Sequence, residues 1–206
     1  AGLTRPITVL SNGVTESFFL ASTPMNQMPP FHVVSVGRLA KEKQQAQLIQ
    51  AVAASPFKND IRLTVAGTGP QQESLIRLAA ALKVEAEIGR VSDERLKTLY
   101  QTADVFVQTS AVELEGMSVL EAMAAGCPVL INHSITSAVP EFVTAPEATY
   151  AMNDEEDLRR KLDAMLADHV LRAAAGWGNR KIAQSRHHDR SVNSLADIYQ
   201  RVLSAH

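Results

Sequence analysis

The sequence is poor in cysteine: Cys127 is the single one in 206 residues. One cysteine excludes an intramolecular disulfide framework and is the usual pattern of a reducing compartment, so we expect a cytoplasmic protein. No apolar run approaches the roughly 20 residues needed to cross a bilayer, which excludes a transmembrane helix. The first residues lack the basic and apolar stretches of a signal peptide, and the chain starts at Ala1 without methionine. We therefore expect a domain fragment of a longer protein.

An excess of charge of either sign is also missing, because 20 basic residues face 22 acidic ones and the net charge is −2. The attraction that dominates nonspecific nucleic-acid binding is therefore not evident, and we expect no nucleic-acid partner. A Walker-type Gly-Lys-Ser/Thr motif is absent, which argues against a nucleoside triphosphatase of that class. Gly67-Thr68-Gly69 lacks the third glycine of a dinucleotide fingerprint. No histidine pair has the spacing of metal ligands on one helix face, and we expect no metal site.

Short β-branched runs alternate with longer segments of helical periodicity, and this alternation is typical of a parallel sheet covered by helices on both faces. The length suits one compact domain. The predicted strands are 32–37, 61–67, 84–89, 104–109, 128–132 and 148–152. The predicted helices are 42–54, 70–82, 93–103, 117–125 and 154–166. We therefore predict an α/β fold, a Rossmann-like doubly wound sheet of six parallel strands with its ligand cleft at the carboxyl ends of the strands.

Two segments flank this repeat. Residues 1–30 contain a turn at Ser11-Asn12-Gly13 and end in Pro29-Pro30, which is typical of a linker. Residues 168–206 form a helical extension whose apolar stripe needs something to pack against. The α/β domain itself is then expected over 31–167.

The most informative stretch runs from Glu113 to Glu121, two acids eight positions apart around Gly116. Glu113 lies in the loop after a strand, and Gly116 to Ser118 open a helix whose first amides have no intrahelical partners. Those amides and the positive end of the helix dipole suit a diphosphate. Glu121 is about one turn inside the helix, where its carboxylate can accept both hydroxyls of a ribose. Glu113 would face the far side of the phosphates, where a sugar could lie.

A plainer interpretation stays open for this stretch taken alone. Glu113 and Glu115 could be solvated loop acids, and Glu121 an exposed helix residue favoured by the dipole. The acidic cluster Asp154-Glu155-Glu156-Asp157 is interpreted in that plain way, as the capped first turn of a helix, and not as a metal site.

The pattern of motifs over nearly the whole chain resembles glycosyltransferase family 4, whose members have the two-domain GT-B fold and transfer a sugar from a nucleotide donor with retention. The Glu-x7-Glu motif continues into Ala-Met-Ala-x-Gly-x-Pro-Val, as in that family. Further stretches resemble the family in its order, and they are Ser11-Asn12-Gly13-Val14, Val36-Gly37-Arg38-Leu39 with Lys43, Val65-Ala66-Gly67-Thr68-Gly69-Pro70, residues 99–107 and Pro140-Glu141.

The resemblance implies roles for individual residues. Gly37, Arg38 and Lys43 would clamp the donor diphosphate, whose negative charge grows as the glycosidic bond breaks. Glu121 would bind the ribose, and Glu113 would orient the donor sugar. The remaining implied donor contacts are the amides of Gly116, Met117, Ser118 and Val119, and the segment Gly89, Arg90 and Val91 beside the base. The catalytic residues would be Glu113, Arg38 and Lys43.

The resemblance also implies that the chain is the C-terminal donor-binding half of such an enzyme. The acceptor domain would precede the linker, outside this chain, and the final helix would cross back onto it. The donor would be a nucleoside diphosphate hexose, with a UDP-sugar favoured and GDP- and ADP-sugars open, and no cofactor or metal would be needed. The acceptor would be a hydroxyl of a lipid or saccharide, in polysaccharide or glycolipid biosynthesis, and peripheral association of the full-length enzyme with a membrane stays open. This fragment alone is expected to be inactive.

Two positions depart from the family pattern: Gln44 stands where many members have glycine, and Glu115 where an aromatic residue is frequent. Two other functions also stay open. One is a stand-alone nucleotide-binding module that needs a partner chain. The other is a sugar-nucleotide epimerase of similar fold, although the acidic motif argues against it.

Overall fold

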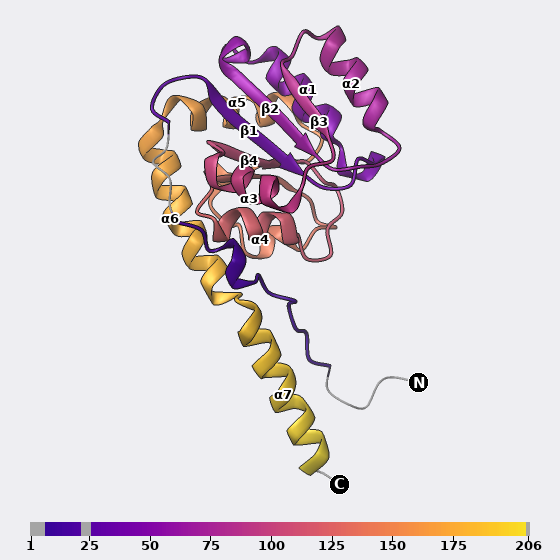
Figure 1. Cartoon of the computed structure of the whole chain (residues 1–206), viewed down its shortest axis with the longest axis vertical. Helices are drawn as coiled ribbons and strands as arrows, with labels where there is room; N and C mark the ends of the chain where they lie inside the picture. The colour runs from indigo at the N-terminus through magenta and orange to yellow at the C-terminus, as the bar shows by residue number, and fades with distance from the viewer. Residues whose placement is uncertain (1–6, 22–25, 205–206) are drawn as a thin grey trace.

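The computed structural model describes residues 7–21 and 26–204. Its centre is one sheet of six parallel strands in the order β3-β2-β1-β4-β5-β6 (Figure 1). This confirms the predicted fold class, and each strand lies within two residues of its predicted bounds. The strands are β1 (Phe31–Val36), β2 (Ile61–Ala66), β3 (Ala86–Gly89), β4 (Val105–Gln108), β5 (Val129–His133) and β6 (Thr149–Ala151).

Seven α-helices lie among the described residues, five of them in the connections that the sequence predicts. The α-helices are α1 (Gln45–Ala54), α2 (Gln72–Ala81), α3 (Asp93–Thr102), α4 (Met117–Ala124), α5 (Glu155–Ala167), α6 (His169–Ser185) and α7 (His188–Ser204). The short 3-10 helices are η1 (Glu16–Phe18), η2 (Lys41–Lys43), η3 (Lys58–Asp60), η4 (Val139–Glu141) and η5 (Pro146–Ala148). The Asp154 side chain caps α5 by accepting the Asp157 amide, as the acidic cluster predicts.

The predicted helix over 42–54 is wrong in one respect, because it is split at Gln44. Residues before this position form η2, and α1 starts after it. Gln44 itself has φ 51 and ψ 29, a left-handed conformation that ends one helical segment and redirects the chain into the next. Glycine adopts this conformation at lower cost than other residues, which explains why glycine suits this position.

The core is built on both faces of the sheet. Every residue of β4 is buried, and so are Val33 and Val34 of β1. Such strands are typical of parallel sheets that helices cover on both sides. Helix α1 packs against α2 and α5, whereas α4 packs against α3 and α6, which gives the three layers seen in Figure 1. Cys127 is buried in this core, so its thiol is not exposed to reagents.

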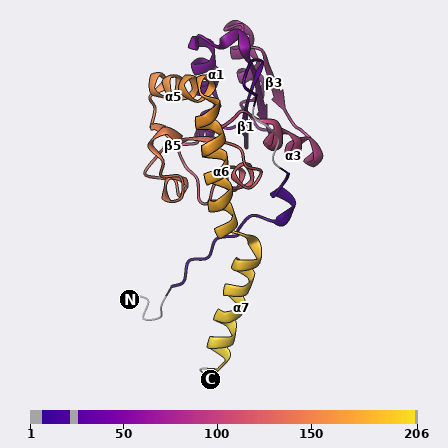
Figure 2. The same ribbon diagram turned by 90° about the vertical axis from the view of Figure 1, so that its left-hand side faces the viewer.

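The C-terminal residues form two helices with different surroundings. Helix α6 packs along α4 and buries Arg172, whose guanidinium donates to the carbonyls of Met165 and Leu166 at 2.6 Å each. Helix α7 continues away from the sheet and has no buried residue (Figure 2). No described helix is both long enough and apolar enough to span a bilayer.

Candidate functional site

A cavity of about 590 Å³ opens at the carboxyl edge of the sheet, between β1 and β4. The strand order reverses at this point, because the chain moves from β1 outward to β3 and then returns to β4 on the other side of β1. Open α/β sheets bind ligands at such a switch point. The cavity is lined by Asn12, Val36, Gly37, Arg38, Glu42, Lys43, Val112, Glu113, Leu114, Glu115, Gly116, Met117 and Ser118.

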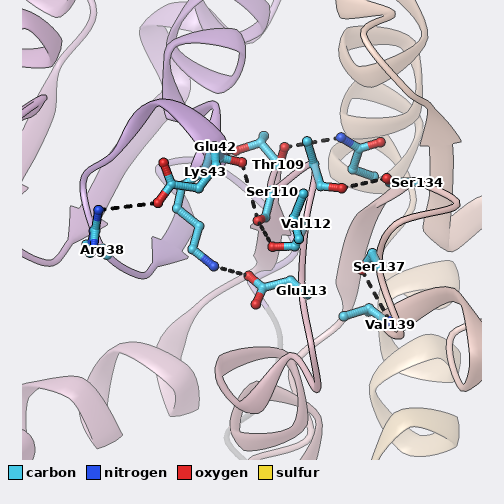
Figure 3. Close-up of polar contacts among 12 residues, drawn as sticks. Arg38, Glu42, Lys43, Thr109, Ser110, Val112, Glu113, Ser134, Ser137 and Val139 are labelled. Carbon is cyan, nitrogen blue, oxygen red and sulfur yellow. Dashed lines mark hydrogen bonds and ion pairs between the residues drawn. The ribbon is translucent and has the colours of Figure 1, made fainter.

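The loop after β1 places Arg38 at the rim of this cavity. The Leu39 amide donates to Thr68 O and the Gln45 side chain donates to Arg38 O, both at 2.9 Å, so the backbone of the loop is fixed. The Arg38 guanidinium lies 3.5 Å from the Glu42 carboxylate, and its side chain is 68% exposed (Figure 3). An ion pair this exposed is weak, so the guanidinium can turn to another anion at little cost.

Lys43 points deeper into the same cavity and meets Glu113. Its ammonium donates to Glu113 Oε1 at 2.6 Å, and the two side chains are 22% and 16% exposed (Figure 3). The Thr109 hydroxyl donates to Lys43 O at 2.7 Å and the Ala111 amide donates to Glu42 O at 3.0 Å, which ties η2 to the loop after β4. Because an ammonium has three donors, Lys43 can hold Glu113 and a second anion together.

Helix α4 begins at the floor of the cavity. Gly116 is its N-cap with φ 71 and ψ 46, and a Cβ at this position would lie 2.3 Å from Val139 Cγ2, so only glycine fits. The amides of Val119 and Leu120 donate to Gly116 O. Among the described residues, the amides of Met117 and Ser118 have no acceptor, and both residues line the cavity. Val119 therefore contributes a bonded amide and a buried side chain rather than a free donor.

Glu121 lies one turn further along α4 and does not line the cavity. Its Oε2 accepts a hydrogen bond of 2.8 Å from the Tyr100 hydroxyl of α3. Burial raises the pKa of the Glu121 carboxyl from its ordinary value of 4.5, and the Tyr100 hydrogen bond opposes that rise. Tyr100 belongs to the stretch 99–107 that resembles the family, but nothing in that stretch indicates its contact with Glu121.

The third group of predicted residues lies at the same edge of the sheet, where Gly89 ends β3 and Arg90 and Val91 follow it. Gly89 O accepts the Gly67 amide at 2.8 Å. These three residues do not line the cavity between β1 and β4. The structure thus brings together the predicted site residues Gly37, Arg38, Lys43, Glu113, Gly116, Met117 and Ser118, and leaves Gly89, Arg90, Val91, Val119 and Glu121 beside them.

Six lining residues were not predicted to belong to the site, and they are Asn12, Val36, Glu42, Val112, Leu114 and Glu115. Asn12 and Glu115 contact each other. Asn12 donates through its amide to Glu115 Oε1 at 2.6 Å, and Ser11 donates to the same carboxylate. Ser11 and Asn12 lie in the turn that is predicted to belong to the linker. The signal that could have found them is Glu115 itself, the acid at a position where the family favours an aromatic residue.

The chemistry of the cavity suits an anionic ligand, although carboxylates are also present. Its basic side chains and free amides can donate hydrogen bonds to phosphate oxygens. Each lining carboxylate has a partner of its own, because Glu42 pairs with Arg38, Glu113 with Lys43, and Glu115 with the 11–12 turn. Within residues 7–21 and 26–204, no group of three or more His, Cys, Asp or Glu side chains could hold a metal ion.

Comparisons with known proteins show which family the chain resembles. The family model described as "Glycosyl transferases group 1" matches residues 23–182. The GDP-mannose-dependent alpha-(1-6)-phosphatidylinositol dimannoside mannosyltransferase of Mycobacterium tuberculosis is 35% identical over 126 residues, which cover 60% of this chain and 32% of that protein. The chain thus spans about a third of the length of the curated relatives that it matches.

Solved structures show the same fold. The crystal structure of the catalytic domain of cholesterol-alpha-glucosyltransferase from Helicobacter pylori is 35% identical, with a TM-score of 0.70, and the match covers 76% of this chain and 99% of that one. HepE from Anabaena, crystallised with UDP and glucose, is 22% identical with a TM-score of 0.75, over 83% of this chain and 48% of that one. The sheet matches the Rossmann-like domains of GT-B glycosyltransferases. With its family model matched over most of its length, the chain belongs to the group 1 glycosyl transferases.

Proposed function

We propose that this chain is the donor-binding half of a retaining hexosyltransferase of glycosyltransferase family 4. It binds a nucleoside diphosphate sugar in the cavity between β1 and β4, and the hexose is transferred to a hydroxyl of a lipid or saccharide. UDP-sugars are the favoured donors, and GDP- and ADP-sugars stay open. The observation that carries the proposal is the convergence of Arg38, Lys43 and the free amides of Met117 and Ser118 on one cavity.

These groups explain how bond cleavage would be assisted. As the glycosidic bond breaks, the diphosphate gains negative charge, and donors that are already in place stabilise that charge without reorganising. The free amides add the positive end of the α4 dipole. Lys43 stays fixed through its contact with Glu113, while the exposed Arg38 exchanges Glu42 for a phosphate oxygen. No metal is required, because the cations and amides neutralise the leaving group.

Glu113 is the residue that we assign to the donor sugar. Its carboxylate is largely buried beside Lys43, and its backbone carbonyl accepts the Ala138 amide at 2.9 Å, which holds the loop in place. A carboxylate fixed in this way can accept sugar hydroxyls and orient the reacting carbon. We call it donor-orienting, and Arg38 and Lys43 complete the proposed catalytic set.

The ribose and base would extend from the cavity along the edge of the sheet. Glu121 lies five residues after Gly116, an axial rise of about 7.5 Å, which a nucleoside diphosphate spans between phosphate and ribose. Tyr100 uses one position on Oε2, and the other carboxylate lone pairs remain for the ribose hydroxyls. Gly89, Arg90 and Val91 would then flank the base from the end of β3.

The rest of the enzyme is also part of the proposal. Residues 1–30 would link to an acceptor domain that precedes them, 31–167 would be the donor domain, and 168–206 would be the helical extension. Since α6 packs on the donor domain, the contact with the acceptor domain would fall to α7, which exposes Val192, Leu195, Tyr199, Val202 and Leu203. The enzyme would be cytoplasmic and could reach lipid acceptors by peripheral association. Three similar proteins are named for alpha products, and an alpha-linked donor would retain its configuration in such a product.

Calorimetry of the 206-residue chain with UDP, GDP and ADP tests donor binding. We expect UDP to bind, and Arg38→Ala and Glu121→Ala each to weaken it roughly 10- to 100-fold, the effect of losing a hydrogen bond to a charged group. Arg77→Ala is the matched control, because Arg77 forms a similar exposed pair with Glu73 at 3.4 Å on α2. Unchanged UDP affinity in both site variants would refute the assignment. The anomeric configuration of the product, followed by NMR with the full-length enzyme, tests retention.

A further inference from the structure

The Glu115 carboxylate receives three hydrogen bonds from one short turn. Ser11 Oγ, the Asn12 amide and Asn12 Nδ2 all donate to it, across more than 100 residues of sequence. Hydrogen bonds to a carboxylate are among the stronger ones in proteins. The carboxylate therefore fastens residues 11–12 to the loop before α4.

The same turn is also fastened on its other side, at the junction of α6 and α7. Two backbone hydrogen bonds of 2.9 Å make this contact. The Val14 amide donates to Arg186 O, and the His188 amide donates to Val14 O. His188 Nδ1 donates to Asn12 O at 2.9 Å. Gly13 lies between them with φ 69, and a Cβ there would lie 2.8 Å from His188 Cα, so the turn passes too close for a side chain.

Glu115 also lies next to the proposed phosphate site. It directly precedes Gly116, the N-cap of α4, and both Asn12 and Glu115 line the cavity. One carboxylate thus joins a wall of the cavity, formed by Asn12, to the loop that presents the free amides of Met117 and Ser118.

We propose that Glu115 is a positioning residue for donor binding. It holds the 11–12 turn against the start of α4, so that Asn12 and the free amides keep the spacing that a diphosphate needs. The inference rests on the proposed function, because it takes this cavity as the diphosphate site. It also assigns a purpose to an acid at a position where the family favours an aromatic residue.

The charge of Glu115 and its proposed positioning role predict opposite effects on UDP affinity when the carboxylate is removed. This difference tests the proposal. A carboxylate beside the site repels a diphosphate, so its removal should tighten binding if charge alone matters. If Glu115 positions the wall, removal should weaken binding. Glu115→Gln keeps the size of the side chain and loses the charge, and it also removes the acceptor that Asn12 Nδ2 uses, because an amide nitrogen cannot accept a hydrogen bond. Glu147→Gln is the matched control, because this exposed glutamate lies in η5, before β6 and so at the opposite edge of the sheet.

The experiment measures UDP affinity and hydrogen exchange on the 206-residue chain and its variants. We expect Glu115→Gln to weaken UDP binding about tenfold and to speed exchange of the Asn12 and Gly13 amides at least about tenfold, with the melting temperature little changed. Glu147→Gln should change neither quantity. Asn12→Ala should weaken binding as well, and the double variant should lose no more than the stronger single one, because the two residues act through one contact.

Failure of this proposal can be told apart from failure of the proposed function. If Arg38→Ala weakens UDP binding while Glu115→Gln leaves it unchanged or tightens it, the site stands and the positioning role is overturned. Additive losses in the double variant would also overturn it. If UDP does not bind even to the unsubstituted chain, the proposed function fails. In that case, unchanged hydrogen exchange at the Asn12 and Gly13 amides in Glu115→Gln would also overturn the claim that Glu115 holds the 11–12 turn in place.

Discussion

The Tyr100 hydroxyl donates a hydrogen bond of 2.8 Å to Glu121 Oε2, and this contact joins α3 to α4 at the edge of the sheet. Tyr100 is buried, with 1% of its surface exposed, and its ring packs on Phe18 and Phe106. The contact holds the carboxylate that we assign to the ribose, and it opposes the rise in the pKa of Glu121 that burial causes. Substitutions at the two residues should therefore change ligand binding and stability in linked ways.

Tyr100→Phe should destabilise the chain by about 1–3 kcal/mol, because it leaves a half-buried carboxylate oxygen without its donor. The Tyr100 hydrogen bond lowers the pKa of Glu121, so its loss should raise that pKa further. Urea unfolding measures the first effect. Tyr199→Phe is the control, because Tyr199 is 62% exposed on α7, and its change should stay within about 0.5 kcal/mol.

The pH dependence of stability should carry a signature of Glu121. Burial raises the folded-state pKa above the ordinary value of 4.5, so the folded chain keeps this proton to higher pH than the unfolded chain. The stabilisation that results is fully present below 4.5 and is lost as the pH rises through the raised pKa. The free energy of unfolding should be compared for the unsubstituted chain and Glu121→Gln from pH 4 to 8, roughly the range in which a carboxyl with a raised pKa titrates. Only the unsubstituted chain should lose this stabilisation as the pH rises. Parallel pH profiles would contradict it.

The affinity for UDP should depend on the same titration of Glu121. It should increase as the pH rises, whereas the stabilisation of the fold by this group decreases. Protonation removes the charge and one acceptor position of the carboxylate and so weakens its bonds to the ribose hydroxyls, and affinity should therefore fall as the pH drops through the raised pKa of Glu121. In Tyr100→Phe the fall should begin at higher pH, and in Glu121→Gln it should be absent. Calorimetry over the pH range measures all three. An unshifted profile in Tyr100→Phe would show that Glu121 does not control binding.

Gly116→Ala should destabilise the start of α4 and abolish UDP binding. The left-handed conformation costs alanine about 1–2 kcal/mol, and contact with Val139 adds to that cost. Thermal unfolding and calorimetry measure the two effects. Gly178→Ala is the control, because this glycine lies inside α6 with open space around its Cβ, and alanine should stabilise the helix by about 0.5–1 kcal/mol. Equal stability of the two variants would contradict the explanation.

Glu42→Gln should tighten UDP binding about two- to fivefold. The substitution frees Arg38 from an exposed pair worth at most about 1 kcal/mol, and the guanidinium then has no competing carboxylate. Glu73→Gln breaks the corresponding pair with Arg77 on α2 and should leave affinity unchanged. A loss of affinity in Glu42→Gln would mean that Glu42, and not a phosphate, is the working partner of Arg38.

Much of the site could be anticipated because it depends on local sequence. Loops that follow parallel strands must meet at one edge of the sheet, so the segments after β1 and β4 could be placed together from the sequence alone. The cavity lining at Arg38, Lys43, Glu113 and Gly116 agrees with that expectation. The helix start at Gly116 could also be predicted, since its unpaired amides are a property of any helix N-terminus.

By itself, the sequence determined the order of strands and helices, because hydrophobic periodicity and turn residues act over a few positions. Only the tertiary structure decided which distant side chains meet. Glu115 with Asn12, Glu121 with Tyr100 and Glu113 with Lys43 are joined by packing of whole elements, and pairings across tens of residues leave no periodic trace in the chain. The left-handed turn at Gln44 belongs with these contacts, because glutamine has no local preference for it, and the two residues before it are tied to the loop after β4 through Glu42 O and Lys43 O.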